Sequence, residues 1–194
     1  MLNETAMTHG RHWSGQSVRG WLACEQYRGC RAFWDGADLW SRGGLRVDLP
    51  AAYRAELPDG RELDFEVWAG RGPHNGLEER EAVNAVVHGK FTASIRLLVL
   101  DAPDVLASWP ERMAVAAGLL TGSELVRPVG FEQLTGLKHL ERLFADVTRA
   151  GGEGLMLHSP AAPAAYQRGR HGWLRKVKQD PALARGVVRF PLAA

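Results

Sequence analysis

Apolar side chains occupy every second position along residues 61–69, with Leu63, Phe65 and Val67 on one side. A period of two predicts a β-strand with one buried face. Residues 94–100 are apolar almost throughout and predict a central strand that is covered on both faces. Together with 22 glycines and 10 prolines, these segments favour a turn-rich mixed fold over a helical bundle.

Longer segments with helical spacing lie between the predicted strands. In residues 134–149, Leu137, Leu140 and Phe144 recur at intervals of three and four, which predicts an amphipathic helix. The other expected elements are helices over residues 51–53, 77–88 and 109–120, strands over residues 21–24, 29–34, 38–42, 154–157, 173–178 and 186–190, and a loop over residues 160–172. This mixed order predicts an α+β domain.

The length of 194 residues allows one domain. Residues 1–17 are polar and predict a loose N-terminal arm, so we expect residues 18–194 to form a single domain. No apolar run approaches the roughly 18 residues that a membrane-spanning helix needs. Residues 1–16 contain no apolar signal segment. The sequence therefore predicts a cytoplasmic protein without membrane contact.

The charged residues and cysteines identify no partner by themselves. The net charge of +2 is too small to argue for nucleic acid. Cys24 and Cys30 would lie roughly 20 Å apart on an extended chain, too far for a disulfide. The histidines lack the spacing of a zinc site. Any assignment of function must therefore come from motifs.

Several short segments carry more information in their order than any one of them does alone. In chain order they are Cys24–Arg31, Ala32–Gly36, Ser41–Gly44, Asp64–Trp68, Gly70–Gly72, Leu98–Pro103, Gly152–Leu157, Tyr166, Gly169–Arg170 and Lys176–Lys178. At these spacings they resemble the nucleotidyltransferase domain of ATP-dependent DNA ligases, in particular the minimal bacterial and phage type. The resemblance runs from about Trp21 to Lys178. It implies antiparallel sheets with packed helices around a nucleotide cleft, and a family role in sealing DNA nicks during repair or replication.

The first motif of that family departs from the family pattern here. The family has Lys-x-Asp-Gly-x-Arg, in which the lysine attacks the α-phosphate of ATP. In this chain Gln26 stands at the lysine position and Arg28 at the aspartate position, whereas Gly29 and Arg31 are kept. The covalent step needs an amine with a free lone pair, and the amide nitrogen of glutamine is delocalised. The resemblance therefore predicts that no catalytic residue is intact and that the chain does not adenylate itself.

Other matching positions imply nucleotide and metal binding. Arg42 matches the arginine that organises the nucleotide and the nick phosphate, and Glu66 matches the acid that holds the ribose. Leu100 stands where the family usually has an aromatic residue that stacks on adenine. The implied nucleotide-binding set is Arg31, Arg42, Glu66, Leu100, Lys176 and Lys178. The resemblance also implies ATP or AMP and Mg²⁺ as cofactors, with Glu66 and Glu153 supporting the metal.

The chemistry of these residues agrees with such roles. Two lysines at i and i+2 on a strand point to one face, so Lys176 and Lys178 can reach the same phosphate. Arg28 reverses a charge near the expected metal, which should repel a cation. We therefore expect Arg28 to form an ion pair with Asp64, Glu66 or Glu153 in place of the metal.

Three interpretations stay open at this point. The chain is a degenerate ligase with weak nucleotide binding, a non-catalytic module that binds nicked or end-bearing DNA or a partner protein, or the product of a decayed gene that retains only its fold. For the second, the contact face would be Arg31, Arg42, Lys176 and Lys178. Family members carry an oligonucleotide-binding barrel after the last lysine pair. The residues that follow Lys178 are too few for it, so we expect the barrel to be absent and DNA binding to be weak and nonspecific.

Overall fold

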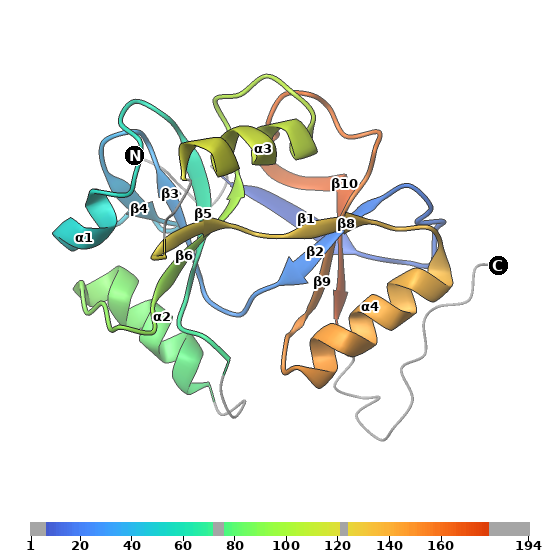
Figure 1. Cartoon of the computed structure of the whole chain (residues 1–194), viewed down its shortest axis with the longest axis horizontal. Helices are drawn as coiled ribbons and strands as arrows, with labels where there is room; N and C mark the ends of the chain where they lie inside the picture. The colour runs from blue at the N-terminus through green and yellow to red at the C-terminus, as the bar shows by residue number, and fades with distance from the viewer. Residues whose placement is uncertain (1–6, 72–75, 121–123, 179–194) are drawn as a thin grey trace. The chain divides into compact units, whose positions relative to one another are not determined.

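The structure is a computed structural model that describes residues 7–71, 76–120 and 124–178. Its elements, coloured along the chain in Figure 1, are β1 (Thr8–His12), β2 (Leu22–Gln26), β3 (Cys30–Trp34), β4 (Leu39–Ser41), α1 (Ala51–Arg54), β5 (Leu63–Trp68), α2 (Leu77–His88), β6 (Arg96–Asp101), α3 (Trp109–Leu119), β7 (Val126–Pro128), β8 (Phe131–Gln133), α4 (Leu137–Arg149), β9 (Gly154–His158) and β10 (Gly169–Lys178). The expected α+β class is therefore confirmed. The described part contains no helix long and apolar enough to cross a membrane.

The sequence predicts one domain, whereas the contacts within the chain define two compact units. The first unit is built mainly from residues 28–129, with short contributions from Met7–Thr8 and residues 163–169. The second unit contains residues 9–27, 130–162 and 170–178. Each unit has its own five-stranded sheet and its own hydrophobic core.

The sheet of the first unit has the strand order β4-β3-β5-β6-β7. Neighbouring strands are antiparallel except β6 and β7, which are parallel. Helix α2 packs against β3 and β5, and α3 packs against β6 and β7. Alternate residues of the central strands, such as Phe65, Val67 and Val99, enter the core with Ala82 and Val86 of α2. The period of two at residues 61–69 therefore identifies the buried face correctly.

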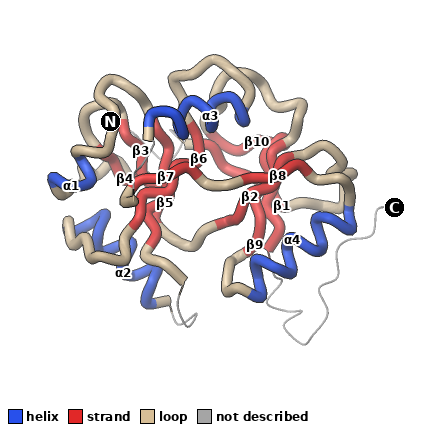
Figure 2. The backbone as a smooth tube through the Cα atoms, in the orientation of Figure 1, coloured by secondary structure: helices blue, strands red, loops and turns tan. Residues whose placement is uncertain are grey.

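The sheet of the second unit has the order β1-β10-β9-β2-β8. Helix α4 packs beside β9, as the tube drawing in Figure 2 also shows. Leu140 and Phe144 of α4 pack with Leu155, Leu157 and other buried residues of the sheet, which confirms the amphipathic helix expected from their spacing. The core of this unit therefore lies between α4 and one face of the sheet.

The N-terminal segment differs from its expectation. Thr8–His12 forms β1 in the sheet of the second unit, where the sequence predicts a loose polar arm. Met7 is fully buried and Trp13 is only 8% exposed. The polar composition does not predict this strand, because β1 is short and its main-chain groups pair with a strand distant in the chain. The local hydrophobic pattern therefore contains little information about it.

Other differences are smaller. Strands β7 and β8 have three residues each and were not expected, and β10 begins at Gly169, inside the expected loop. The helix over residues 77–88 is as predicted, and the strands expected over residues 29–34 and 38–42 form β3 and β4. The strand expected over residues 186–190 lies outside the described residues.

Candidate functional site residues in the two units

In the first unit, Arg31 on β3 forms a bidentate ion pair with Asp64 on β5. Its Nε and Nη2 donate to the two carboxylate oxygens of Asp64 at 2.5 and 2.6 Å. Burial alone would lower the pKa of Arg31, but the charge and hydrogen bonds of Asp64 raise it above its ordinary value. Asp64 is fully buried, so this pair satisfies a carboxylate that would otherwise be costly to bury.

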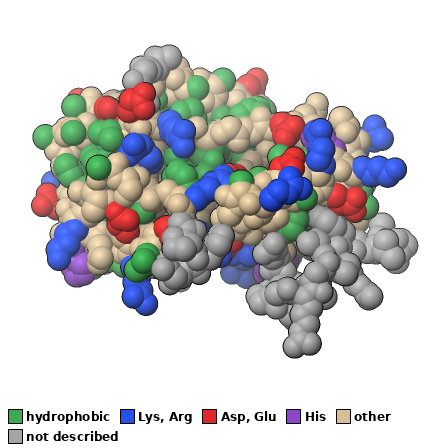
Figure 3. Space-filling view, turned by 60° about the horizontal axis from the view of Figure 1, so that its bottom comes forward, with side chains coloured by type: hydrophobic (Ala, Val, Ile, Leu, Met, Phe, Trp, Pro, Cys, Tyr) green, Lys and Arg blue, Asp and Glu red, His purple; other side chains and the backbone are tan. Residues whose placement is uncertain are grey.

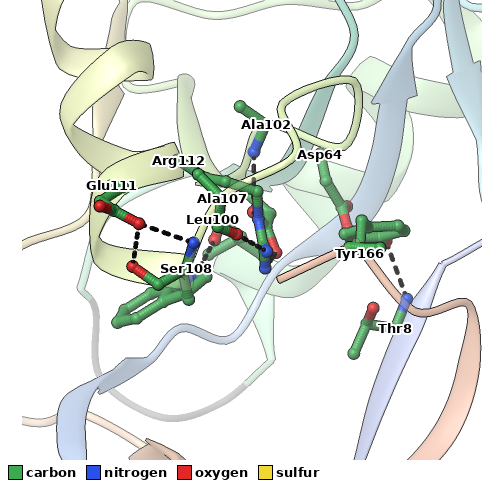
Figure 4. A network of polar contacts seen from close by, with 12 residues as sticks. Thr8, Asp64, Leu100, Ala102, Ala107, Ser108, Glu111, Arg112 and Tyr166 are labelled. Carbon is green, nitrogen blue, oxygen red and sulfur yellow. Dashed lines mark hydrogen bonds and ion pairs between the residues drawn. The ribbon is translucent and has the colours of Figure 1, made fainter. Parts of the chain in front are cut away.

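Tyr166 completes the surroundings of Asp64. Its hydroxyl donates to Oδ2 of Asp64 at 2.5 Å and accepts a hydrogen bond from the backbone N–H of Thr8 at 2.9 Å, as Figure 4 shows. Burial, followed by the charge of Asp64, raises the pKa of Tyr166. The phenol therefore stays protonated and holds residues 163–169 against β5.

A second buried ion pair lies beside the first. Asp64 and Asp101 are register partners on β5 and β6, next to a bulge. Arg112 on α3 donates from Nε and Nη2 to Asp101 at 2.6 and 2.9 Å. Its Nη1 donates to the carbonyl oxygens of Ala107 and Ala164, both at 2.7 Å (Figure 4). Burial raises the pKa of Asp101 in spite of Arg112. The guanidinium of Arg112 thus links α3, β6 and the 163–169 segment through hydrogen bonds.

The sequence only partly indicates these buried groups. Asp64 was expected as a partner of Arg28, and Tyr166 only as part of the resemblance. Arg112 was not singled out, although a signal exists: it falls on the buried side of α3, which also carries Trp109, Met113 and Ala116. An arginine within an apolar stripe requires an acidic or carbonyl partner when it is buried.

The remaining expected residues of the first unit share this region. Glu66 lies directly across from Arg31 in register, on the sheet face opposite the α2 core. Leu100 is half-buried, and its carbonyl oxygen accepts a hydrogen bond from the indole of Trp109 at 2.9 Å. Arg42 follows β4 directly and is exposed, and its backbone N–H donates to the carbonyl of Arg31 at 3.1 Å. Burial, followed by the charges of Glu66 and Glu79, raises the pKa of Cys30 to about 11.

In the second unit, Gln26, Glu153 and Lys178 form one hydrogen-bonded cluster. Nε2 of Gln26 donates to Oε2 of Glu153 at 2.7 Å, and Nζ of Lys178 donates to Oε1 at 2.6 Å. Oε1 of Gln26 is buried and has no hydrogen-bond partner among the described residues. Each oxygen of Glu153 thus accepts a hydrogen bond from a protein donor.

Strand register explains why these three side chains meet. Gly154 on β9 pairs with Gln26 on β2 on one side and with Lys178 on β10 on the other. A Cβ at Gly154 would lie 2.0 Å from the carbonyl oxygen of Val177, so only glycine permits this approach of the strands. Glu153, immediately before Gly154, is placed between the ends of its two neighbours.

The ion pair expected for Arg28 is not formed with its candidates in the first unit. Arg28 is exposed, and within the described residues no ion pair joins it to Asp64 or Glu66. Asp64 is occupied by Arg31 and Tyr166, as described above, and Glu153 by donors of the second unit. For Asp64 the prediction was wrong, because Tyr166 and the neighbouring Arg31 already satisfy the buried acid.

Four basic side chains gather on the sheet face of the second unit that is turned away from α4. We call this set, His12, Arg170, Lys176 and Lys178, the cationic face. Burial, followed by Lys178 and Arg170, lowers the pKa of Lys176, and Glu153 only partly opposes this. On the face drawn in Figure 3, acidic and basic side chains are interspersed. Among the described residues, no group of three or more metal-ligating side chains is suited to hold a metal.

The named proteins that are similar in sequence to this chain are DNA ligases. No protein-family profile matches the chain. The chain is 30% identical over 171 residues to a DNA ligase of Haemophilus influenzae, which covers 86% of this chain and 60% of the relative. It is 31% identical over 133 residues to DNA ligase 2 of Korarchaeum cryptofilum, covering 67% of this chain and 21% of the relative. The chain thus spans less than two thirds of the length of these relatives.

Solved structures agree with these relatives. A structure from an analysis of DNA binding by Lig E DNA ligases has a TM-score of 0.75 and 28% identity, covering 89% of this chain and 68% of that one. The Chlorella virus DNA ligase–adenylate has a TM-score of 0.69 at 21% identity, covering 89% and 67%, which supports the fold alone. The ATP-dependent DNA ligase of bacteriophage T7, in complex with ATP, has a TM-score of 0.63 at 15% identity, covering 90% and 68%. The chain is therefore similar to DNA ligases and has the fold of the nucleotidyltransferase domain of the ATP-dependent DNA ligases.

Proposed function

We propose that this chain is a ligase-type nucleotidyltransferase domain that binds phosphate groups of DNA but forms no covalent adduct with AMP. The observation that carries the proposal is the hydrogen bond from Gln26 to Glu153 at the position of the family's nucleophile. An amide that donates to a carboxylate cannot also act as an attacking amine.

The chemistry of adenylation gives the reason. An uncharged amine must form a bond to the α-phosphorus of ATP while the bond to the bridging oxygen breaks, pyrophosphate leaves and the amine loses a proton. The lone pair of the Gln26 amide is delocalised into its carbonyl. Nζ of Lys178 forms an ion pair with Glu153 at 2.6 Å, and an ammonium group in an ion pair has no free lone pair. Neither group supplies the attacking nitrogen.

The same residues support binding to phosphate. Within the described part of the chain, no ion pair or hydrogen bond involves the side chains of Arg170 and Lys176, and both lie on the cationic face. Arg31 and Lys178 have acidic partners, so they are less free to contact DNA. We propose nicked or nonspecific duplex DNA as the partner, with a dissociation constant of roughly 10⁻⁴–10⁻⁶ M. ATP or AMP would be a noncovalent ligand of the same domain. The hydrogen bonds that Gln26 and Lys178 donate to Glu153 argue against a metal at that carboxylate.

Two measurements test the proposal. The purified chain is incubated with α-labelled ATP and Mg²⁺ or Mn²⁺, and acid-precipitated protein is examined for label, with the Haemophilus influenzae relative as positive control. We expect no label on this chain. A labelled adduct, mapped by mass spectrometry to any lysine, would overturn the claim of lost adenylation. Fluorescence anisotropy with nicked, intact and single-stranded oligonucleotides tests the second claim, which fails if none of them binds at low salt.

A further inference from the structure

His12 lies on the same sheet face as the lysines of β10, although it comes from the other end of the chain. Strands β1 and β10 are neighbours in the sheet, and the N–H of Trp13 donates to the carbonyl of Lys176 at 3.0 Å. A Cβ at Gly10 would contact Met156 and Leu174, which places Gly10 on the face opposite α4. His12 is two residues further along β1 and therefore points to that face as well.

The surroundings of His12 are strongly basic. Lys176, Lys178 and Arg170 of β10 all act on its imidazole, and burial together with these charges lowers the pKa of His12. Arg175 of β10 donates to the backbone oxygen of His12 at 3.3 Å. On β9 and β2, the nearest ionisable pair on this face is His158 and Cys24, whose Nε2 and Sγ are 4.0 Å apart.

The cationic face carries more basic than acidic side chains. Glu153 is the acid that acts on Lys176, and its two oxygens are already engaged by Gln26 and Lys178. The imidazole of His12 is exposed, and within the described residues no hydrogen bond or ion pair involves it. Grouped cations without acidic partners are stabilised by a bound anion, and phosphate oxygens fit both imidazolium and ammonium donors.

We propose that His12 is a further phosphate ligand of this domain, and that its imidazolium binds a phosphate group of DNA between β1 and β10, next to Lys176. The inference rests on the proposed DNA binding and adds to it a residue and a dependence on pH. DNA is favoured over a free nucleotide because the basic side chains extend along β10 from Arg170 to Lys178, which is more than one phosphate group occupies.

Proton linkage gives the expected sign. In the free protein, desolvation by burial and then the basic neighbours lower the pKa of His12, and a phosphate oxygen would raise it. Binding of DNA therefore takes up a proton, and affinity increases as pH falls from 8 to 5.5. Burial, followed by Lys178 and Arg170, lowers the pKa of Lys176 as well, so the His12→Gln variant is needed to assign the pH dependence to the imidazole.

The experiment measures affinity for an intact duplex with 5′-hydroxyl ends by fluorescence anisotropy at pH 5.5 and pH 8. Such a duplex has only phosphodiesters, whose charge is constant over this range, whereas a terminal phosphate titrates near pH 6. We expect affinity about fivefold higher at pH 5.5, the scale of one exposed ion pair. His12→Gln should abolish most of this difference and lower the salt slope at pH 5.5 by about one.

Controls separate the sources of the effect. Arg142→Gln removes a basic side chain from exposed α4, on the opposite side of the sheet, and should leave the pH difference unchanged. AMP and ATP in place of the duplex show whether a nucleotide phosphate alone raises the pKa of His12. In NMR titrations of the full chain, the imidazole of His12 should show a higher pKa with DNA, with the exposed His88 of α2 as internal reference.

The outcomes are distinct. Equal pH dependence in the parent and His12→Gln, or an unchanged His12 pKa in saturating DNA, overturns this inference and leaves the proposed function in place. A rise of the His12 pKa with AMP but not with DNA also overturns it and assigns the residue to the nucleotide. Failure of the parent to bind DNA at low salt overturns the proposed DNA binding itself.

Discussion

The hydroxyl of Tyr166 donates a hydrogen bond to the buried carboxylate of Asp64 at 2.5 Å, although 102 positions separate the two residues in the chain. The same carboxylate receives two donors from Arg31. Three donors from β3 and the 163–169 segment thus meet on one acid of β5. The carboxylate of Asp64 therefore takes its hydrogen bonds from Arg31 and Tyr166, where the sequence predicts an ion pair with Arg28.

Removal of the phenol tests how much that contact contributes. Tyr166→Phe should lower the free energy of unfolding by about 2 kcal/mol, because hydrogen bonds to charged groups contribute roughly 1.5–3 kcal/mol. Tyr53→Phe is the matched control, since the Tyr53 hydroxyl donates to the neutral carbonyl of Ile95 at 2.9 Å. It should cost about 1 kcal/mol. Urea unfolding of both variants provides the comparison, and an equal or smaller loss for Tyr166→Phe would contradict the charged contact.

Because Asp101 and Arg112 form a buried ion pair, the free energy of unfolding of Arg112→Met should depend on pH. Arg112→Met leaves the Asp101 carboxylate buried without its partner and should cost about 3–5 kcal/mol at pH 7. Burial already raises the pKa of Asp101, and loss of Arg112 raises it further. An acid with a raised pKa binds more protons when folded, so stability falls as pH rises above about 4.

The variant should therefore be less destabilised at pH 5 than at pH 7, as thermal unfolding at the two pH values would show. The double variant Asp101→Asn with Arg112→Met carries no charge at this position and should lose the extra pH dependence. A penalty for Arg112→Met that is independent of pH would count against an ionised, buried Asp101.

Restoration of the first motif tests the cause of lost adenylation. Gln26→Lys with Arg28→Asp should recover some label from α-labelled ATP, because it supplies both an amine and the acid that the family has beside it. Gln26→Lys alone should recover less, since Glu153 would pair with the new ammonium and Arg28 would still oppose a metal. Acid-precipitated label is the readout. Equal label in the single and double variants would show that Arg28 has no part in the loss.

The salt dependence of DNA binding reports on the lysines of β10. With about three to five phosphate contacts, the slope of log K against log salt should be roughly −3 to −4.5. Lys176→Ala with Lys178→Ala should reduce its magnitude by about two if both side chains touch phosphate. Arg142→Gln is again the control, and anisotropy at several salt concentrations gives the slopes. A double variant with the parental slope would exclude the two lysines from the DNA contact.

Local pattern was sufficient for most individual elements. The alternation at residues 61–69 gives the buried face of β5, and the spacing in α4 gives Leu140 and Phe144 as core positions. The ordered motifs also indicate a resemblance to DNA ligases, and the similar proteins are DNA ligases. These features are predictable because periodicity and motif order are properties of neighbouring residues.

The partners of the charged groups were decided only by tertiary structure. The sequence points to Gln26, Glu153 and Lys178 one by one, whereas their contact depends on the strand order β10-β9-β2 and on the register at Gly154. It assigned Arg28 to acids that other donors occupy, and it left β1 as a loose arm. Gln26 pairs with Glu153, and Tyr166 with Asp64, across more than 100 positions of the chain. Such pairings are determined by strand order and register, and the periodic pattern of the local sequence specifies neither of these.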